Sequence, residues 1–121
     1  MKLKEGVSLC GLHPAMRLPI YAASQIWNDH GRELVITAAI EDGHSDFSLH
    51  PFGQAVDFRT NYFDPEMKSR VYSELAEVLR DYNSEDAYFR YRGRTFQNYS
   101  GVYLPYKEPD HIHVGFLGSK L

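Results

Sequence analysis

Apolar and polar positions recur with two different periods along this chain. Between residues 19 and 30 apolar side chains return at three- and four-residue spacing, which predicts a helix with one buried face. The same spacing returns at 65–82, where Asp64 is a favourable N-cap and Pro65 suits the first helical turn. The apolar positions are Ile20, Ala23, Ile26 and Trp27 in the first segment, and Met67, Val71, Leu75, Val78, Leu79 and Tyr82 in the second.

Shorter segments predict strands. Residues 33–40 (ELVITAAI) are β-branched and apolar on both faces in their second half, which predicts a central strand. Residues 87–91 are expected to form a further strand. We also expect strands at 53–59 and 111–116, where alternation matters because successive side chains point to opposite faces.

In the strand at 53–59, alternation places Ala55 and Asp57 on one face, with apolar Val56 and Phe58 on the other. In the strand at 111–116, it places His111 and His113 on one face, with apolar Ile112 and Val114 on the other. Both strands therefore present side chains that can bind a metal or transfer a proton on one face, and apolar core residues on the other.

The chain has 121 residues, which is enough for one domain spanning 1–121. We expect an α+β fold with a central antiparallel sheet and helices packed on one side. A formal net charge of −3 argues against a non-specific nucleic-acid binder. The single cysteine, Cys10, excludes an intrachain disulfide and is expected to be a buried thiol.

No apolar stretch is long enough to span a membrane, and lysines interrupt the N-terminal segment before any apolar core of a signal peptide. We therefore expect no membrane span and no secretory signal peptide. The expected location is the cytoplasm until release, or a phage particle. We expect a monomer.

The chemically distinctive residues lie in two segments, 44–59 and 108–116. They hold four of the six histidines and two carboxylates, namely His44, His50, His111 and His113 with Asp57 and Asp110. Two imidazoles and a carboxylate with one open position are the ligand set of a catalytic zinc ion. Such ligands would also hold cobalt or manganese.

The first segment contains S-x-H-x-x-G-x-A-x-D, as Ser48, His50, Gly53, Ala55 and Asp57. The second contains D-x-x-H overlapping H-x-H, which begins at Asp110 and ends at His113. Together the two motifs resemble the zinc metallopeptidase group that includes D-Ala-D-Ala carboxypeptidases, phage L-alanyl-D-glutamate endopeptidases and the hedgehog signalling domain. The resemblance extends through roughly residues 33–116.

The resemblance implies a role for each matching residue. His50, Asp57 and His113 match the three zinc ligands, with one Zn²⁺ per chain. Asp110 matches the acidic general base, and His111 and His44 match site histidines that do not bind the metal. Supporting or substrate-binding positions are Ser48, Gly53 and Ala55.

At two positions this chain differs from particular members of the family. Many D-Ala-D-Ala enzymes carry a basic motif before the first ligand loop, whereas this chain has Glu41-Asp42 there, so the oxyanion-stabilising residue is not identified. The hedgehog domain has its acidic residue six positions before the last ligand, where this chain has Lys107. Asp110 instead resembles the acid of the bacterial and phage enzymes.

The resemblance therefore predicts a zinc-dependent peptidase that hydrolyses stem peptides of bacterial peptidoglycan, as an endopeptidase or a D-Ala-D-Ala carboxypeptidase. Metal-activated water would attack the peptide carbonyl, with Asp110 as the base. The alternative is a non-catalytic, zinc-stabilised binding module of a phage particle or a wall-associated assembly. A further open question is whether Arg90, Arg92 or Arg94 binds a substrate carboxylate or lies on a solvated edge.

Overall fold

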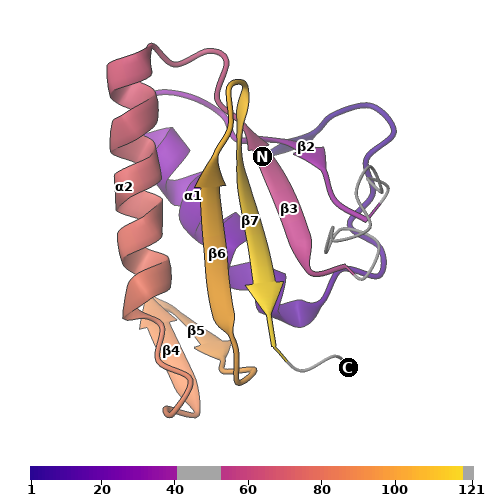
Figure 1. The fold of residues 1–121 in the computed structure, drawn as a ribbon, viewed down its shortest axis with the longest axis vertical. Helices are drawn as coiled ribbons and strands as arrows, with labels where there is room; N and C mark the ends of the chain where they lie inside the picture. Colours follow the sequence, from indigo (N-terminus) through magenta and orange to yellow (C-terminus); the bar gives the residue numbers. More distant parts are fainter. Residues whose placement is uncertain (41–52, 119–121) are drawn as a thin grey trace.

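The computed structural model describes residues 1–40 and 53–118. These residues form a sheet in the order β1-β2-β3-β7-β6, a separate β4–β5 hairpin and two α-helices (Figure 1). The strands are β1 (Lys2–Leu3), β2 (Val35–Ala38), β3 (Ala55–Arg59), β4 (Tyr88–Tyr91), β5 (Arg94–Gln97), β6 (Val102–Lys107) and β7 (His111–Leu117), and the helices are η1 (Pro14–Met16), α1 (Arg17–Asp29) and α2 (Pro65–Asp81).

Helix α1 begins two residues before the predicted start, because the short helix η1 leads directly into it. The imidazole Nδ1 of His13 caps η1 by accepting a hydrogen bond from the backbone N–H of Ala15 at 3.0 Å. Pro19 then falls within the first turn of α1, where its missing N–H removes no intrahelical bond. Helix α2 has the predicted N-cap, since the Asp64 carboxylate accepts from the Met67 N–H at 2.7 Å.

The predicted α+β class is confirmed, and the antiparallel pairing expected for the sheet is found between β2, β3 and β7, with β6 added as a further antiparallel neighbour of β7. The sheet is nevertheless mixed, because β1 pairs parallel to β2. Strand β6 was not predicted, and Pro105 within it argues against a strand by sequence alone. It is tolerated because β6 lies at the edge of the sheet, where a missing N–H need not face a partner strand.

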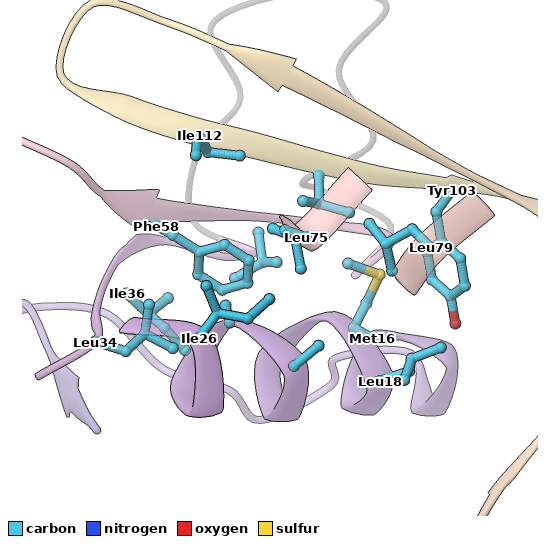
Figure 2. Packing of buried hydrophobic residues seen from close by; sticks show 14 of the residues in the cluster. Met16, Leu18, Ile26, Leu34, Ile36, Phe58, Leu75, Leu79, Tyr103 and Ile112 are labelled. Carbon is cyan, nitrogen blue, oxygen red and sulfur yellow. The ribbon is translucent and has the colours of Figure 1, made fainter. Parts of the chain in front are cut away.

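The core lies between the helices and one face of the sheet (Figure 2). Phe58 of β3 and Ile112 of β7 are fully buried against Ile26 of α1 and Leu75 of α2. The Trp27 indole N–H also donates to the Arg59 carbonyl at 3.0 Å, which fastens α1 to the end of β3. The predicted division of β3 and β7 into a core face and a polar face is therefore confirmed.

Cys10 was expected to be buried, but its side chain is exposed, because it lies in the irregular segment before η1 and faces away from the core. Within the described residues, no helix is long and apolar enough to cross a membrane.

Candidate functional site

The site is built on the sheet face that points away from the helices. Strands β3 and β7 are antiparallel neighbours, and their register sets Asp57 directly opposite His113. The same register sets Arg59 opposite His111 and Ala55 opposite Gly115. Directly opposed residues have side chains about 5 Å apart at their Cβ atoms, so these pairs are close enough to interact.

Asp57 is the most buried member, with 8% of its side chain exposed, against 25% for His113 and 27% for His111. The Nδ1 atom of His113 lies 2.7 Å from Oδ1 of Asp57. The other carboxylate oxygen, Oδ2, lies 3.5 Å from Nε2 of His111. A buried carboxylate needs such partners, because burial without them would carry a large desolvation cost.

His111 also contacts a second carboxylate. Its Nδ1 atom lies 2.7 Å from Oδ1 of Asp110, whose side chain is 75% exposed. The hydrogen bond from His111 is the main reason that the pKa of Asp110 is held below its usual value, with a smaller contribution from the charge of Lys68. Asp110 is therefore kept as a carboxylate, which is the form that can accept a proton.

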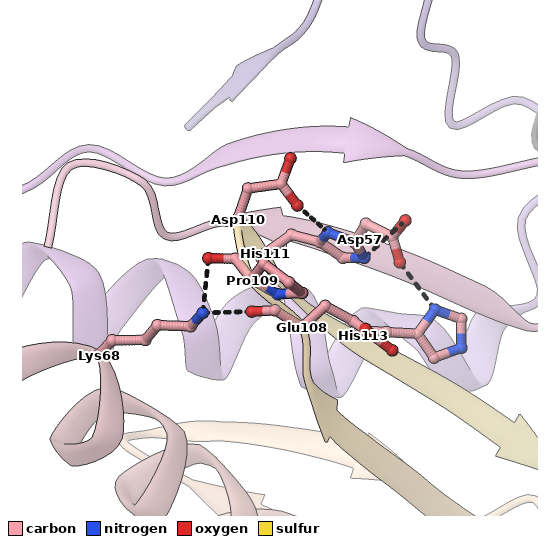
Figure 3. A network of polar contacts seen from close by, with 7 residues as sticks. All are labelled: Asp57, Lys68, Glu108, Pro109, Asp110, His111 and His113. Atoms are coloured by element: carbon pink, nitrogen blue, oxygen red, sulfur yellow. Dashed lines mark hydrogen bonds and ion pairs between the residues drawn. The ribbon is translucent and has the colours of Figure 1, made fainter. Parts of the chain in front are cut away.

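The position of Asp110 depends on the turn between β6 and β7. Strand β7 begins at His111, so Asp110 lies in that turn, as its predicted role requires. The Lys68 ammonium group of α2 donates to the backbone carbonyls of Glu108 and Pro109 in the same turn (Figure 3). The Asp110 carbonyl accepts from the Thr60 N–H at 3.0 Å, so the residue that follows β3 also holds the turn.

Zinc is the cofactor that the motifs imply, and the described residues supply part of its ligand set. Asp57 Oδ1 and His113 Nδ1 are atoms that can bind zinc, and they face one another across two adjacent strands. Imidazole nitrogen and carboxylate oxygen are both ligands that zinc takes in proteins, so this pair fits the chemistry of the metal. No group of three metal-binding side chains occurs within 1–40 and 53–118.

Of the predicted site residues, the structure brings Asp57, Asp110, His111 and His113 into one contact network. His44, Ser48 and His50 lie outside the described residues, so the predicted third ligand is not placed.

Ala55 is the first residue of β3, and Gly53 lies two residues before it; both are buried. The carbonyl of Gly53 accepts from the His13 N–H at 2.8 Å, and Ala55 faces Gly115. Gly53 therefore supports the close approach of two backbone segments, which a glycine permits because it has no Cβ atom.

Sequence reasoning missed three residues near the site. The sequence does not indicate that Lys68 contacts the site, because a basic residue in the first turns of a helix is usually solvated. Tyr106 became visible only once β6 was known, since it pairs with His113 with ring centroids 6.4 Å apart. Arg59 could have been found, because two-residue alternation from Asp57 places it on the same face of β3.

Comparison of the chain with protein-family models, with curated proteins and with solved structures gave no match. The family resemblance described from the two motifs therefore stays a prediction.

Proposed function

We propose that this chain is a zinc-dependent peptidase that hydrolyses peptide bonds in the stem peptides of bacterial peptidoglycan. The observation that carries the proposal is the placement of Asp57 opposite His113, with the imidazole of His111 between Asp57 and Asp110. A carboxylate and an imidazole side by side are suitable zinc ligands, and an exposed carboxylate held in its ionised form is a suitable general base.

His113 and Asp57 would hold the metal, with His50 as the third ligand. The Nδ1 atom of His113 lies 2.7 Å from Oδ1 of Asp57, and it can bind a metal only when it carries no proton. A neutral imidazole meets this condition by carrying its proton on Nε2 instead. Bound zinc would polarise the peptide carbonyl and lower the pKa of a bound water to about 7.

Asp110 accepts a proton from the attacking water and passes it to the leaving amine. His111 orients Asp110 through the 2.7 Å hydrogen bond and keeps its pKa low. The negative charge that develops on the carbonyl oxygen needs a donor or a cation nearby. Arg59 and His111 are the candidates on this face, and His44 is the candidate proposed from the motif.

The decisive experiment uses zinc-loaded protein with purified peptidoglycan and with synthetic stem peptides, and mass spectrometry of the products. We expect one new cleavage product, and we expect Asp110→Asn to reduce its rate of formation by at least about 100-fold, the scale of general-base catalysis. The matched control is Asp86→Asn, which removes a carboxylate from an exposed position before β4. Full activity of Asp110→Asn would contradict the mechanism.

The second candidate is a non-catalytic binding module in which zinc serves stability or recognition. The replacement of the family's basic motif by Glu41-Asp42 favours it. Stoichiometric zinc binding with no product from any stem peptide would support this candidate over the peptidase.

A further inference from the structure

One cavity bounded by described residues is not lined by Asp57 or His113. It is a groove of about 890 Å³ between the η1–α1 segment and the β4–β5 hairpin. Figure 1 shows the hairpin itself near the lower end of α2. This volume is within the range of sites that hold drug-sized ligands or short peptides.

The groove opens on the helix side of the sheet. Tyr103 lines it, and the Tyr103 hydroxyl donates to the Ala15 carbonyl at 2.6 Å beside α1. Tyr106, three residues further along β6, instead pairs with His113. Side chains an odd number of positions apart on a strand face opposite sides, so the groove and the proposed catalytic site lie on opposite faces of the sheet.

The charge of the groove is opposite to that of the whole chain. The chain carries a formal net charge of −3, yet Arg17 and Arg94 line the groove and no described residue lining it is acidic. Neither arginine makes an ion pair with any residue that the structure describes. Both side chains are exposed, as contact with an external anion requires.

The other two arginines of the hairpin have different surroundings from Arg94. The Arg92 guanidinium is bound to Asp29 at 2.7 Å, and Arg92 lies in the turn with φ +45° rather than on a strand face with its neighbours. Arg90 lines a different hollow, together with Glu74, Glu77 and Asp81.

Aromatic rings hold Arg94 in place. Its guanidinium lies 4.6 Å from the centre of the Tyr21 ring, and the Tyr21 hydroxyl donates to the Arg92 carbonyl at 3.0 Å. Phe96 also packs against Tyr21, with ring centroids 5.7 Å apart. A guanidinium that is already oriented loses less conformational entropy on binding, and its planar group matches a carboxylate bidentately.

We propose that this groove binds carboxylate groups of peptidoglycan stem peptides on a part of the polymer other than the peptide being cut. This inference rests on the proposed function for the identity of the polymer. Stem peptides containing D-Glu and a C-terminal D-Ala carry free carboxylates, which complement the two arginines. Because the two sites lie on opposite faces of the sheet, the groove serves attachment to the polymer and takes no part in the chemical step.

The test measures co-sedimentation of the full-length Asp110→Asn protein with insoluble peptidoglycan, so that binding is separated from cleavage. We expect Arg94→Gln to weaken binding about tenfold or more, the scale of a lost charge-assisted contact. We expect a larger loss for Arg17→Gln combined with Arg94→Gln, and weakened binding to polymer whose carboxyl groups have been converted to amides. Arg90→Gln is the matched control, because it removes the same charge from the same hairpin outside the groove.

Thermal unfolding of each variant establishes that it is folded. Equal binding by Arg94→Gln, equal binding to amidated polymer, or no co-sedimentation of the parent protein would each overturn the proposal.

A second measurement separates this inference from the proposed function. We expect Arg94→Gln, in a chain that keeps Asp110, to hydrolyse short soluble stem peptides with unchanged kcat and KM and to show a raised KM on intact peptidoglycan. Binding that depends on Arg94 without any hydrolysis would support the groove and refute the peptidase. Hydrolysis of both substrates with an unchanged KM in Arg94→Gln would support the peptidase and refute the groove.

Discussion

At the scale of single residues, Gly53 shows how closely two backbone segments meet beside the site. Its φ is +69°, and a Cβ atom at this position would lie 2.5 Å from the Gly11 carbonyl oxygen. Its own carbonyl accepts from the His13 N–H. An L-residue would therefore face both backbone strain and a steric clash with main-chain atoms that cannot rotate away.

We predict that Gly53→Ala destabilises the protein by about 2–4 kcal/mol, because strain of this kind costs about 1–3 kcal/mol before any clash is added. The matched control is Gly31→Ala, whose φ is +77° but whose added Cβ would meet nothing within 4 Å. Denaturant unfolding of both variants measures the difference, which isolates the clash. Equal destabilisation of the two variants would show that the segment containing Gly11 moves aside at little cost.

The candidate site itself could be predicted only in part at this scale. Alternation within each strand correctly placed Asp57, His111 and His113 away from the core, because the side-chain period of a strand is fixed. The facing of Asp57 and His113 is a property of register, which depends on long-range pairing between β3 and β7. Their grouping was therefore predicted through the family resemblance and not through the local pattern.

At the scale of elements, the β6–β7 turn connects helix α2 to Asp110, the proposed general base. Lys68 lies one turn into α2 and donates to the carbonyls of Glu108 and Pro109, the two residues before Asp110. The charge of Lys68 also contributes to the low pKa of Asp110, after the larger effect of the His111 hydrogen bond. Helix α2 thus contacts the turn that carries Asp110 through the side chain of Lys68.

We predict that Lys68→Met lowers kcat about 3- to 30-fold while the free energy of unfolding changes by less than about 1 kcal/mol, since the lost contacts are exposed. Loss of the nearby positive charge raises the pKa of Asp110. Because the base must be ionised, the acid limb of the pH–rate profile should move to higher pH.

The control for Lys68→Met is Arg70→Met, which removes an exposed basic side chain from the same helix. An equal effect of both substitutions on the pH–rate profile would mean that general charge, and not the contact with the turn, positions Asp110.

Elements were predictable where the local pattern and the tertiary structure agree. The N-cap and the apolar face of helix α2 can both be recognised in the sequence. The helix ends one residue before its predicted end. Strand β6 has no such local pattern, because Pro105 interrupts it and its place in the sheet comes from pairing with β7. The start of α1 was misplaced because η1 continues directly into it.

At the scale of the whole molecule, zinc binding and folding are expected to be linked. The two described candidate ligands come from β3 and β7, strands that are brought together only by folding. A metal that binds the folded state alone stabilises it, by about 2.7 kcal/mol when free zinc is 100 times the dissociation constant. The size of this effect depends on whether Asp57 binds the metal or only orients His113.

We predict that zinc raises the thermal unfolding midpoint of the wild-type protein and that Asp57→Asn abolishes this increase at every zinc concentration tested, because a ligand has been lost. If Asp57 only orients His113, zinc affinity should instead fall about 10- to 100-fold, and the increase should return at higher zinc. Asp86→Asn, an exposed carboxylate on a loop, should behave as wild type. Calorimetric titration gives the same distinction from the zinc stoichiometry, because a lost ligand removes binding whereas a lost orienting contact weakens it.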